Sequence, residues 1–227
     1  VNKDAVSTMT ALGIINGKED GSYFDPTGTV TRAEMAKMLC VAINGGVDPV
    51  LGVKDTPTFT DIKGTWAESY IEYCAANGII AGRGNNKFDP TGTVSATEAA
   101  KMLLGVLGYN AEKSGLVGND WAINVAADAV NAGIAPKGIV LADAMTREQA
   151  AQMAFQTLTA DTVYYTNKGT TVIGSDGMQV IVGASAPVKV ANSKTDDYRT
   201  VSADRDEVQQ FCEKYFSDLT LNSNNHD

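Results

Sequence analysis

The stretch Phe24-Asp-Pro-Thr-Gly-Thr-Val30 occurs again as Phe88-Asp-Pro-Thr-Gly-Thr-Val94, 64 residues further along the chain. The similarity extends outward from both copies: residues 12–17 match residues 77–82, and residues 31–39 match residues 95–103. Self-similarity at a fixed period is typical of proteins that stack one supersecondary unit on the next. The sequence therefore predicts a repeat architecture before it predicts any activity.

A third, weaker copy follows the second. A glycine followed by isoleucine closes an apolar run three times, at residues 13, 78 and 133. Trp66 and Trp121 each stand 12 residues before the glycine of their own copy, and the same count back from Gly13 reaches Val1. We therefore expect three repeats within residues 1–160, at about 1–50, 57–110 and 115–160, the first without its opening segment.

Each repeat has the pattern of a helix, a loop and a second helix. The first helices are expected over about residues 3–12, 66–77 and 121–132, each ending at the glycine that helix C-termini favour. The second helices start at Thr31, Ser95 and Thr146, each with Glu or Gln three residues later, which is the pattern of a capping box. One helical pair has too little core, so we predict a mainly α fold in which three pairs pack around a shared axis.

The shared heptapeptide itself has a structural interpretation. Phe24 and Phe88 are expected in the core, the prolines fix turns, and the glycines supply positive φ angles. The heptapeptide is thus expected to be scaffold, which directs attention to the residues beside it.

Arg32 and Arg147 follow the helix cap directly, in the first turn. A helix dipole disfavours a cation there by roughly a few tenths of a kcal/mol. The unpaired amides at a helix start favour an anion, and a guanidinium beside them would complete a carboxylate or phosphate site. The alternative is a salt bridge to a carboxylate of a neighbouring repeat or to Glu34. The second repeat has Ala96 at this position and should lack the group.

Three residues near the start of the first helices are further candidates for a site. Trp66 and Trp121 open their helices, where an indole can pack in the core, stack on a sugar ring, or do both. Asp61 lies just upstream and can cap the helix or accept a hydrogen bond from a hydroxyl. No complete motif for an EF-hand, a nucleotide, a catalytic nucleophile or zinc is present. We expect no catalytic residue, no metal and no cofactor.

The composition argues against several partners. The 227 residues carry a net charge of −9, which disfavours nucleic acid and anionic membrane surfaces. A run of about 18 apolar residues is lacking, so no membrane insertion is expected. Three cysteines without CxxC spacing are expected to be buried free thiols. The chain opens without a signal-peptide pattern and ends on a polar run, so we expect it to be a piece of a larger protein.

The chain changes character after about residue 160. Runs rich in β-formers at 162–166, 170–173 and 178–182 predict strands, with a hairpin turn over 174–177 and a further strand over 187–190. A helix is expected from Asp204 to about Leu219, with Val208 on its apolar face. Residues 161–227 thus predict a small α+β extension whose sequence discloses no function.

The combined motifs resemble the S-layer homology (SLH) repeat. The second copy carries Phe59-Thr-Asp61, Trp66-Ala67, Asn77-Gly-Ile-Ile-Ala-Gly82, Phe88-Asp-Pro90 and Glu98-Ala-Ala100. Thr31-Arg-Ala-Glu34 matches the family's TRAE signature, and Thr146-Arg-Glu-Gln149 is a common variant of it. The resemblance covers about residues 1–160 and implies a pseudo-threefold module of three repeats around a central helical bundle.

The resemblance also implies a function. Such modules are secreted and hold bacterial surface proteins non-covalently to a secondary cell-wall polysaccharide, often one with a pyruvate ketal on N-acetylmannosamine, without catalysis. By matching motif positions, Arg32 and Arg147 would hold the ketal carboxylate, and Asp61, Trp66 and Trp121 would contact sugar in grooves between repeats. The partners implied are this glycan and the rest of the parent surface protein.

Departures from the family pattern keep two alternatives open. Ala96 replaces the arginine in the second repeat, and Leu116 stands where the third repeat would have its Asp61 equivalent. With degenerate grooves, the module could serve assembly of the surface layer through protein–protein contacts. An enzyme with its catalytic part beyond residue 227 is the remaining alternative.

Overall fold

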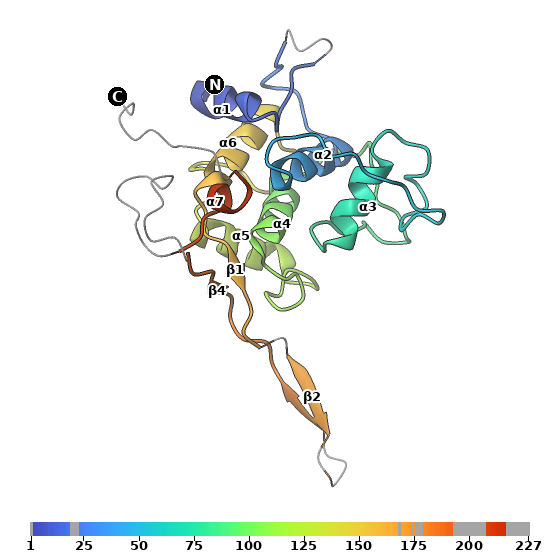
Figure 1. Cartoon of the computed structure of the whole chain (residues 1–227), viewed down its shortest axis with the longest axis vertical. Coiled ribbons are helices and arrows are strands. Elements are labelled where there is room, and N and C mark those ends of the chain that lie inside the picture. Colours follow the sequence, from blue (N-terminus) through green and yellow to red (C-terminus); the bar gives the residue numbers. More distant parts are fainter. Residues whose placement is uncertain are drawn as a thin grey trace.

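The computed structural model describes residues 2–18, 23–167, 169–173, 175, 179–192 and 208–216, and the described part is mainly helical, as predicted. The helices are α1 (Lys3–Ala11), α2 (Arg32–Ile43), α3 (Glu68–Ala76), α4 (Ala96–Leu107), α5 (Trp121–Asn131), α6 (Arg147–Leu158) and α7 (Phe211–Tyr215). The strands are β1 (Val163–Tyr164), β2 (Thr170–Ile173), β3 (Gln179–Val182) and β4 (Val188–Lys189). Figure 1 shows the helices gathered in one body, from which the β2–β3 hairpin projects.

The helix boundaries follow the predicted caps. Thr31, Ser95 and Thr146 each form a complete capping box with the residue three positions later, which starts α2, α4 and α6. The glycines at 13, 78 and 133 follow α1, α3 and α5 with φ of 72°, 68° and 74°. A left-handed conformation at this position is what glycine permits, so these three helices end where the sequence predicts.

A closed ring of backbone hydrogen bonds joins the three repeats. The amide of Val30 donates to the carbonyl of Met145 (3.1 Å), Met145 donates to Val94 (2.9 Å), and Val94 donates back to Val30 (3.0 Å). These residues occupy the position just before the cap in each repeat, and their side chains are at most 1% exposed. The ring is the shared axis that the sequence predicts.

The helix starts beside this ring are also tied to neighbouring repeats. The first amide of α2, at Arg32, donates to Gly92 of the next repeat (2.9 Å), and the second, at Ala33, donates to Pro90 (3.0 Å). The corresponding first and second amides of α4 donate to residues 143 and 141, and those of α6 donate to residues 28 and 26. Because these amides already have carbonyl partners, the expectation that they are free for an anion is wrong.

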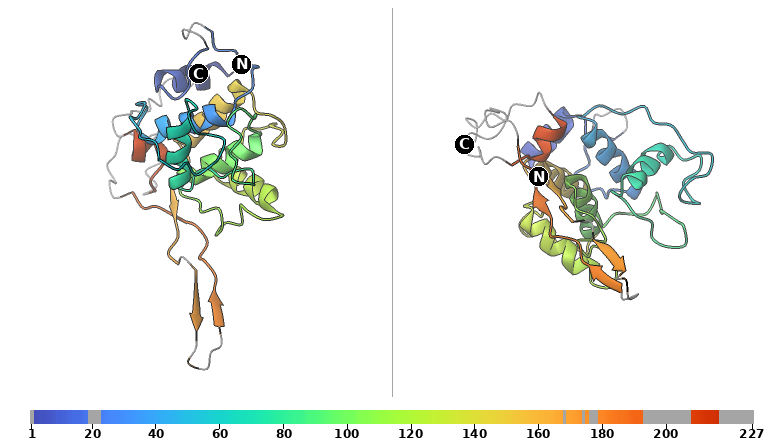
Figure 2. Two further views of the ribbon diagram at one scale, coloured as in Figure 1. Left: turned by 90° about the vertical axis from the view of Figure 1, so that its right-hand side faces the viewer. Right: turned by 60° about the horizontal axis from the view of Figure 1, so that its bottom comes forward.

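Each first helix packs mainly against a second helix from another repeat. The contacting pairs are α1 with α6, α3 with α2, and α5 with α4, so each repeat packs its first helix on the repeat before it, in a closed cycle. Figure 2 shows this helical body from two further directions. The continuous core contains, among others, Met9, Leu39, Ile71, Leu104, Val125 and Met153. No repeat buries its own apolar stripes alone, which explains why three copies are needed.

The heptapeptide builds the turns that reach the neighbouring helix starts. Phe88 is fully buried, as predicted, whereas Phe24 is only half-buried. The positive φ angles fall on Asp25 (51°) and Asp89 (62°), so their assignment to the glycines is wrong. Gly28 is required for another reason: an added Cβ would lie 2.2 Å from the carboxylate of Asp25, and Gly92 has the same relation to Asp89.

Asp61 holds the second of these turns. Its two carboxylate oxygens accept the amides of Phe88 (2.9 Å) and Asp89 (2.8 Å). Burial alone would raise the pKa of Asp61, but these two amides outweigh it and hold the pKa below its ordinary value. The residue therefore connects the opening of the second repeat to its own loop and does not cap a helix.

The extension is joined to the helical body at several points. Strands β1 and β4 pair antiparallel, as do β2 and β3. Phe211 and Phe216, at the two ends of α7, belong to the same core as the repeats, and the amide of Phe211 donates to Ala160. The predicted strand over 170–173 is confirmed with the same bounds, and those near 162–166, 178–182 and 187–190 are confirmed with shorter bounds. Most of the predicted turn lies outside the described residues.

The helix predicted from Asp204 is shorter than expected. Residues 204–207 and 217–219 lie outside the described part of the chain, and α7 begins only at Phe211. Val208, expected on the helix face, instead pairs with Ala191 in a β-bridge, and Gln210 pairs with Asp161. The apolar spacing at 208, 211, 212 and 215 reflects burial beside the core, which a strand followed by one helical turn also satisfies.

The three cysteines are buried and free, as expected. The Sγ atoms of Cys40 on α2 and Cys74 on α3 lie 3.3 Å apart, and the hydrogen bond between them, together with burial, raises the pKa of Cys74. Among the described residues, no helix is long and apolar enough to cross a bilayer.

The ring predicts a large cost for truncating its side chains. Met145→Ala should lower the free energy of unfolding by about 2–5 kcal/mol, because it opens a cavity where all three repeats meet. Ile123→Ala, at a position 71% exposed, should change it by less than about 0.5 kcal/mol. Urea unfolding followed by circular dichroism gives both values. Equal midpoints for the two variants would contradict a central role for the ring.

Asp61 predicts a pH-dependent loss of stability. Because its folded-state pKa is lowered, its contribution is present above the unfolded pKa of about 3.9 and is lost as the pH falls through the folded value. Asp61→Asn should therefore be less stable than the wild type at pH 7, by about 1 kcal/mol or more, and the gap should narrow in strong acid, as the pH falls through the lowered pKa of Asp61. Urea unfolding at pH 7 and in strong acid, with exposed Asp143→Asn as control, checks this. A gap that persists unchanged in acid would show that the ionised carboxylate is not its source.

Candidate functional site

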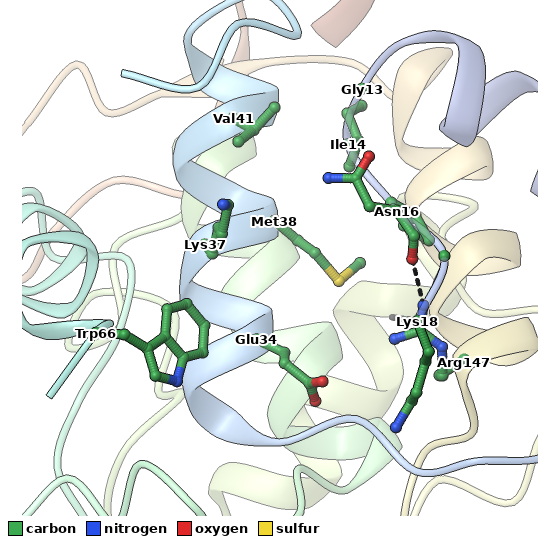
Figure 3. Close-up of a pocket in the computed structure, with 12 residues that line it drawn as sticks. Gly13, Ile14, Asn16, Lys18, Glu34, Lys37, Met38, Val41, Trp66 and Arg147 are labelled. Atoms are coloured by element: carbon green, nitrogen blue, oxygen red, sulfur yellow. Dashed lines mark hydrogen bonds between the residues drawn. The ribbon is translucent and has the colours of Figure 1, made fainter. Parts of the chain in front are cut away.

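Two grooves of the same construction lie between the repeats. The first groove has a volume of about 400 Å³ and is drawn in Figure 3. The loop after α1 forms one wall and α2 forms the other, with Trp66 at the rim and Arg147 at the base. Its lining residues are Gly13, Ile14, Ile15, Asn16, Gly17, Lys18, Glu34, Lys37, Met38, Val41, Trp66 and Arg147.

The second groove, of about 580 Å³, repeats this arrangement one repeat further on. The loop after α3 and the helix α4 form its walls, Arg32 takes the place of Arg147, and Trp121 takes the place of Trp66. Its lining residues are Arg32, Ile79, Ala81, Gly82, Arg83, Glu98, Lys101, Met102, Val117, Gly118 and Trp121. Each groove thus takes its walls from one repeat, its arginine from the repeat before, and its tryptophan from the repeat after.

Arg32 is bound firmly at the base of the second groove. Its Nε donates to the carbonyl of Phe88 (2.8 Å), and its Nη2 donates to that of Ala81 (2.7 Å). Its Nη1 pairs with Glu98 (3.1 Å), and the guanidinium carbon lies 4.4 Å from the ring centroid of Phe88. These partners explain why a cation tolerates the first turn of α2: it faces carbonyls and a carboxylate of the next repeat. The salt bridge to a neighbouring repeat, which the sequence left open, is present.

Arg147 has the same fixed carbonyl partners in the first groove but fewer ionic ones. Its Nε donates to Phe24 (2.9 Å) and its Nη2 to Asn16 (2.5 Å). Among the described residues its Nη1 makes no hydrogen bond and no carboxylate lies within 4.0 Å, so part of the guanidinium is available in the groove. The two arginines therefore do both things that the sequence suggested: they join repeats and line grooves.

The carboxylates at the base of the two grooves differ in their partners. Arg83 binds Glu98 in the second groove through Nη2 (2.8 Å) and also pairs with Asp89 (2.6 Å). Burial alone would raise the pKa of Glu98, but the hydrogen bonds from Arg83 and from the Ser95 amide, with the charge of Arg32, hold it below its ordinary value. The counterpart Glu34 accepts the amide of its own cap residue, Thr31, and has no ion pair among the described residues.

Two lysines in the grooves were missed from the sequence. Lys37 and Lys101 stand one turn inside α2 and α4 and line the first and second groove. The sequence does contain a signal for them, because Lys-Met-Leu follows the capping box in each of the first two repeats. A repeated lysine at this position is equally consistent with a solvated helix face. Only the placement of the neighbouring repeat turns that face into a groove wall.

The tryptophans and Asp61 are distributed differently. Trp66 is 60% exposed at the rim of the first groove, and Trp121 is half-buried in the second, with the Nζ of Lys101 5.3 Å from its ring centroid. Both indoles therefore line grooves, Trp66 largely exposed and Trp121 partly buried against the core. Asp61 lines neither of the two grooves; both of its oxygens are bound by backbone amides of its own repeat.

The third inter-repeat position lacks these groups. Ala96 stands where the other grooves have arginine, as expected, and Gln152 stands where they have Lys37 and Lys101. Asn2 lies close to where a tryptophan would stand. Its side-chain Nδ2 donates to Gln152, and its backbone amide donates to Glu148. This position therefore has no cationic side chain equivalent to those of the other two.

The chemistry available in the grooves is that of binding. Each combines a fixed guanidinium, an ammonium and an indole face, a combination suited to an anionic ligand with an apolar or sugar-like surface. Among the described residues, no cluster of three or more His, Cys, Asp or Glu side chains is suited to hold a metal ion.

Comparison with known proteins agrees with this architecture. The model of the S-layer homology domain matches residues 2–36 and 58–100. An S-layer protein of Bacillus licheniformis is 32% identical over 108 residues, which are 48% of this chain and 12% of that protein. Exoglucanase XynX of Acetivibrio thermocellus is 31% identical over 153 residues, covering 62% of this chain and 14% of that protein.

A third relative extends the match along the chain. The middle cell wall protein of Brevibacillus brevis is 27% identical over 168 residues, covering 74% of this chain and 15% of that protein. The matched region is thus a small part of each of these relatives, 12% to 15% of their length. The two matched segments, the S-layer relatives and the cyclic three-repeat fold together identify the chain as an S-layer homology domain protein.

Proposed function

We propose that this chain anchors a bacterial surface protein to the cell wall by binding a secondary cell-wall polysaccharide in its grooves. The ligand of the proposal is an acidic glycan whose amino sugar carries a pyruvate ketal. The ketal carboxylate is bound by the cations at the groove base, and the sugar face rests on the indole at the rim. The proposed location is outside the cell, at the wall.

The observation that carries the proposal is the make-up of the two grooves. A guanidinium whose orientation is fixed by backbone carbonyls is preorganised for a carboxylate, so little side-chain entropy is lost when the ligand binds. An indole face beside it supplies stacking area with few rotatable bonds. The guanidinium and the indole of each groove come from two different repeats, so the site exists only when the ring of repeats is closed.

The relatives support the anchoring part of the proposal. Two of them are named as an S-layer protein and a cell wall protein, and a third is named as an exoglucanase. A module shared by layer proteins and a glycan-degrading enzyme fits a common attachment role better than a common reaction. We therefore propose that the module itself is non-catalytic and that any catalysis belongs to other parts of the parent protein.

The proposal predicts binding to purified cell-wall sacculi that depends on the ketal. The wild-type chain should sediment with sacculi, and mild acid treatment that removes pyruvate should abolish most of this binding. Trp66→Ala with Trp121→Ala should weaken it by at least about tenfold, because two stacking platforms are lost. Sedimentation with quantification of the unbound fraction gives the result.

A matched variant separates binding from folding. Arg32→Ala with Arg147→Ala should also abolish binding, but these side chains hold neighbouring loops, so circular dichroism must confirm the fold. Ile123→Ala with Val130→Ala, on the exposed face of α5, should bind as the wild type does. Binding that survives both pyruvate removal and loss of the tryptophans would contradict the proposed mode.

A further inference from the structure

The two grooves are built alike but contain different ion pairs, and we propose that this difference makes the second groove the principal anion site. The first groove then binds the same ligand more weakly, and Asp48 is the residue that weakens it. The inference rests on the proposed function and adds a rank order to its sites.

Lys101 is the first reason for this order. No carboxylate of the described residues lies within 4.0 Å of its ammonium, which stands over the ring of Trp121. Burial, with a further effect from the charge of Arg32, lowers the pKa of Lys101, and the opposing charge of Glu98 does not offset them. A half-buried cation of this kind has lost part of its hydration without gaining a carboxylate at ion-pair distance, so an arriving carboxylate stabilises it strongly.

Lys37, its counterpart in the first groove, already has a counter-ion. Its Nζ lies 2.8 Å from the Oδ2 of Asp48, and the hydroxyl of Tyr70 donates to the other oxygen at 2.7 Å. The hydrogen bond to Asp48 is the main cause that raises the pKa of Lys37. A ligand carboxylate must compete with Asp48 for this lysine, whereas Lys101 has no ion-paired carboxylate among the described residues to be displaced.

The carboxylates inside the two grooves also favour anion binding in the second groove over the first. Glu98 in the second groove is neutralised by two guanidinium groups, those of Arg32 and Arg83. Glu34 in the first groove has no cation within ion-pair distance among the described residues, and Figure 3 shows its carboxylate directed across the groove toward Lys18 and Arg147. An entering anion is repelled by an unneutralised carboxylate much more than by a paired one.

The first groove still keeps some affinity. The Nη1 of Arg147 is available there, and Trp66 offers a more exposed face than Trp121. The third position has neither the arginine nor the lysine. The resulting order of affinity for an anionic sugar is second groove, first groove, third position.

The two tryptophans of the chain allow the order to be measured in one sample, because each groove contains one of them. The ¹⁵N-labelled protein is titrated with the methyl glycoside of N-acetylmannosamine bearing a pyruvate ketal, and the two indole N–H signals are followed. Trp66→Phe and Trp121→Phe assign the signals, and the same glycoside without the ketal is the control ligand. The Trp121 signal should reach its midpoint at roughly tenfold lower ligand concentration than that of Trp66.

Two charge variants test the cause. Lys101→Gln should raise the midpoint of Trp121 roughly tenfold and leave that of Trp66 in place. Asp48→Asn should lower the midpoint of Trp66 by about threefold, since the competing carboxylate is neutralised, whereas Asp55→Asn in the same loop should not.

Failure of the rank order and failure of the proposed function give different results. Equal midpoints, or a lower midpoint for Trp66 than for Trp121, would overturn the rank order, and no effect of Asp48→Asn would overturn the role given to Asp48. Each of these results leaves groove binding intact. If neither indole signal shifts with the ketal-bearing sugar in folded protein, the proposed function itself is overturned, and the rank order with it.

Discussion

The ring of three backbone hydrogen bonds among Val30, Met145 and Val94 is the constraint on which the rest of the structure depends. It places each second helix with its first turn against a loop of the next repeat, so the first two helix amides find partners there. It also brings helices of different repeats together, so that each first helix packs on a second helix of another repeat. A single repeat therefore has neither a closed core nor satisfied helix ends, and the grooves exist only in the closed assembly of three.

The arginines show how the same contact can serve scaffold and site. A cation in the first turn of a helix is unfavourable in isolation, but here the guanidinium of Arg32 is surrounded by two carbonyls, an aromatic face and Glu98. The partners fix its position at the base of a groove, as they do for Arg147. Replacement by Ala96 at the third position removes a link between repeats and a groove cation together, which is why a repeat array can lose one site and keep its fold.

Local signals made much of the fold predictable, and long-range contacts account for what was missed. Thr31, Ser95 and Thr146 could be identified as helix starts because a capping box is completed within four residues. The partners of Arg32 lie up to 66 residues away, so its salt bridge could only be left as an alternative. Val208 was assigned to a helix because its pairing with Ala191 is invisible in the local pattern. Lys37 and Lys101 line grooves only because neighbouring repeats lie beside them, and no local pattern indicates this.

The central claim is that an acidic sugar binds between repeats, on groups that three different repeats supply. A crystal structure of the protein with the ketal-bearing sugar tests it most directly. The account predicts the carboxylate in the second groove within hydrogen-bond distance of Lys101, beside Arg32, with the sugar ring against Trp121. A sugar bound on an outer face, or an empty second groove at saturating ligand, would contradict it.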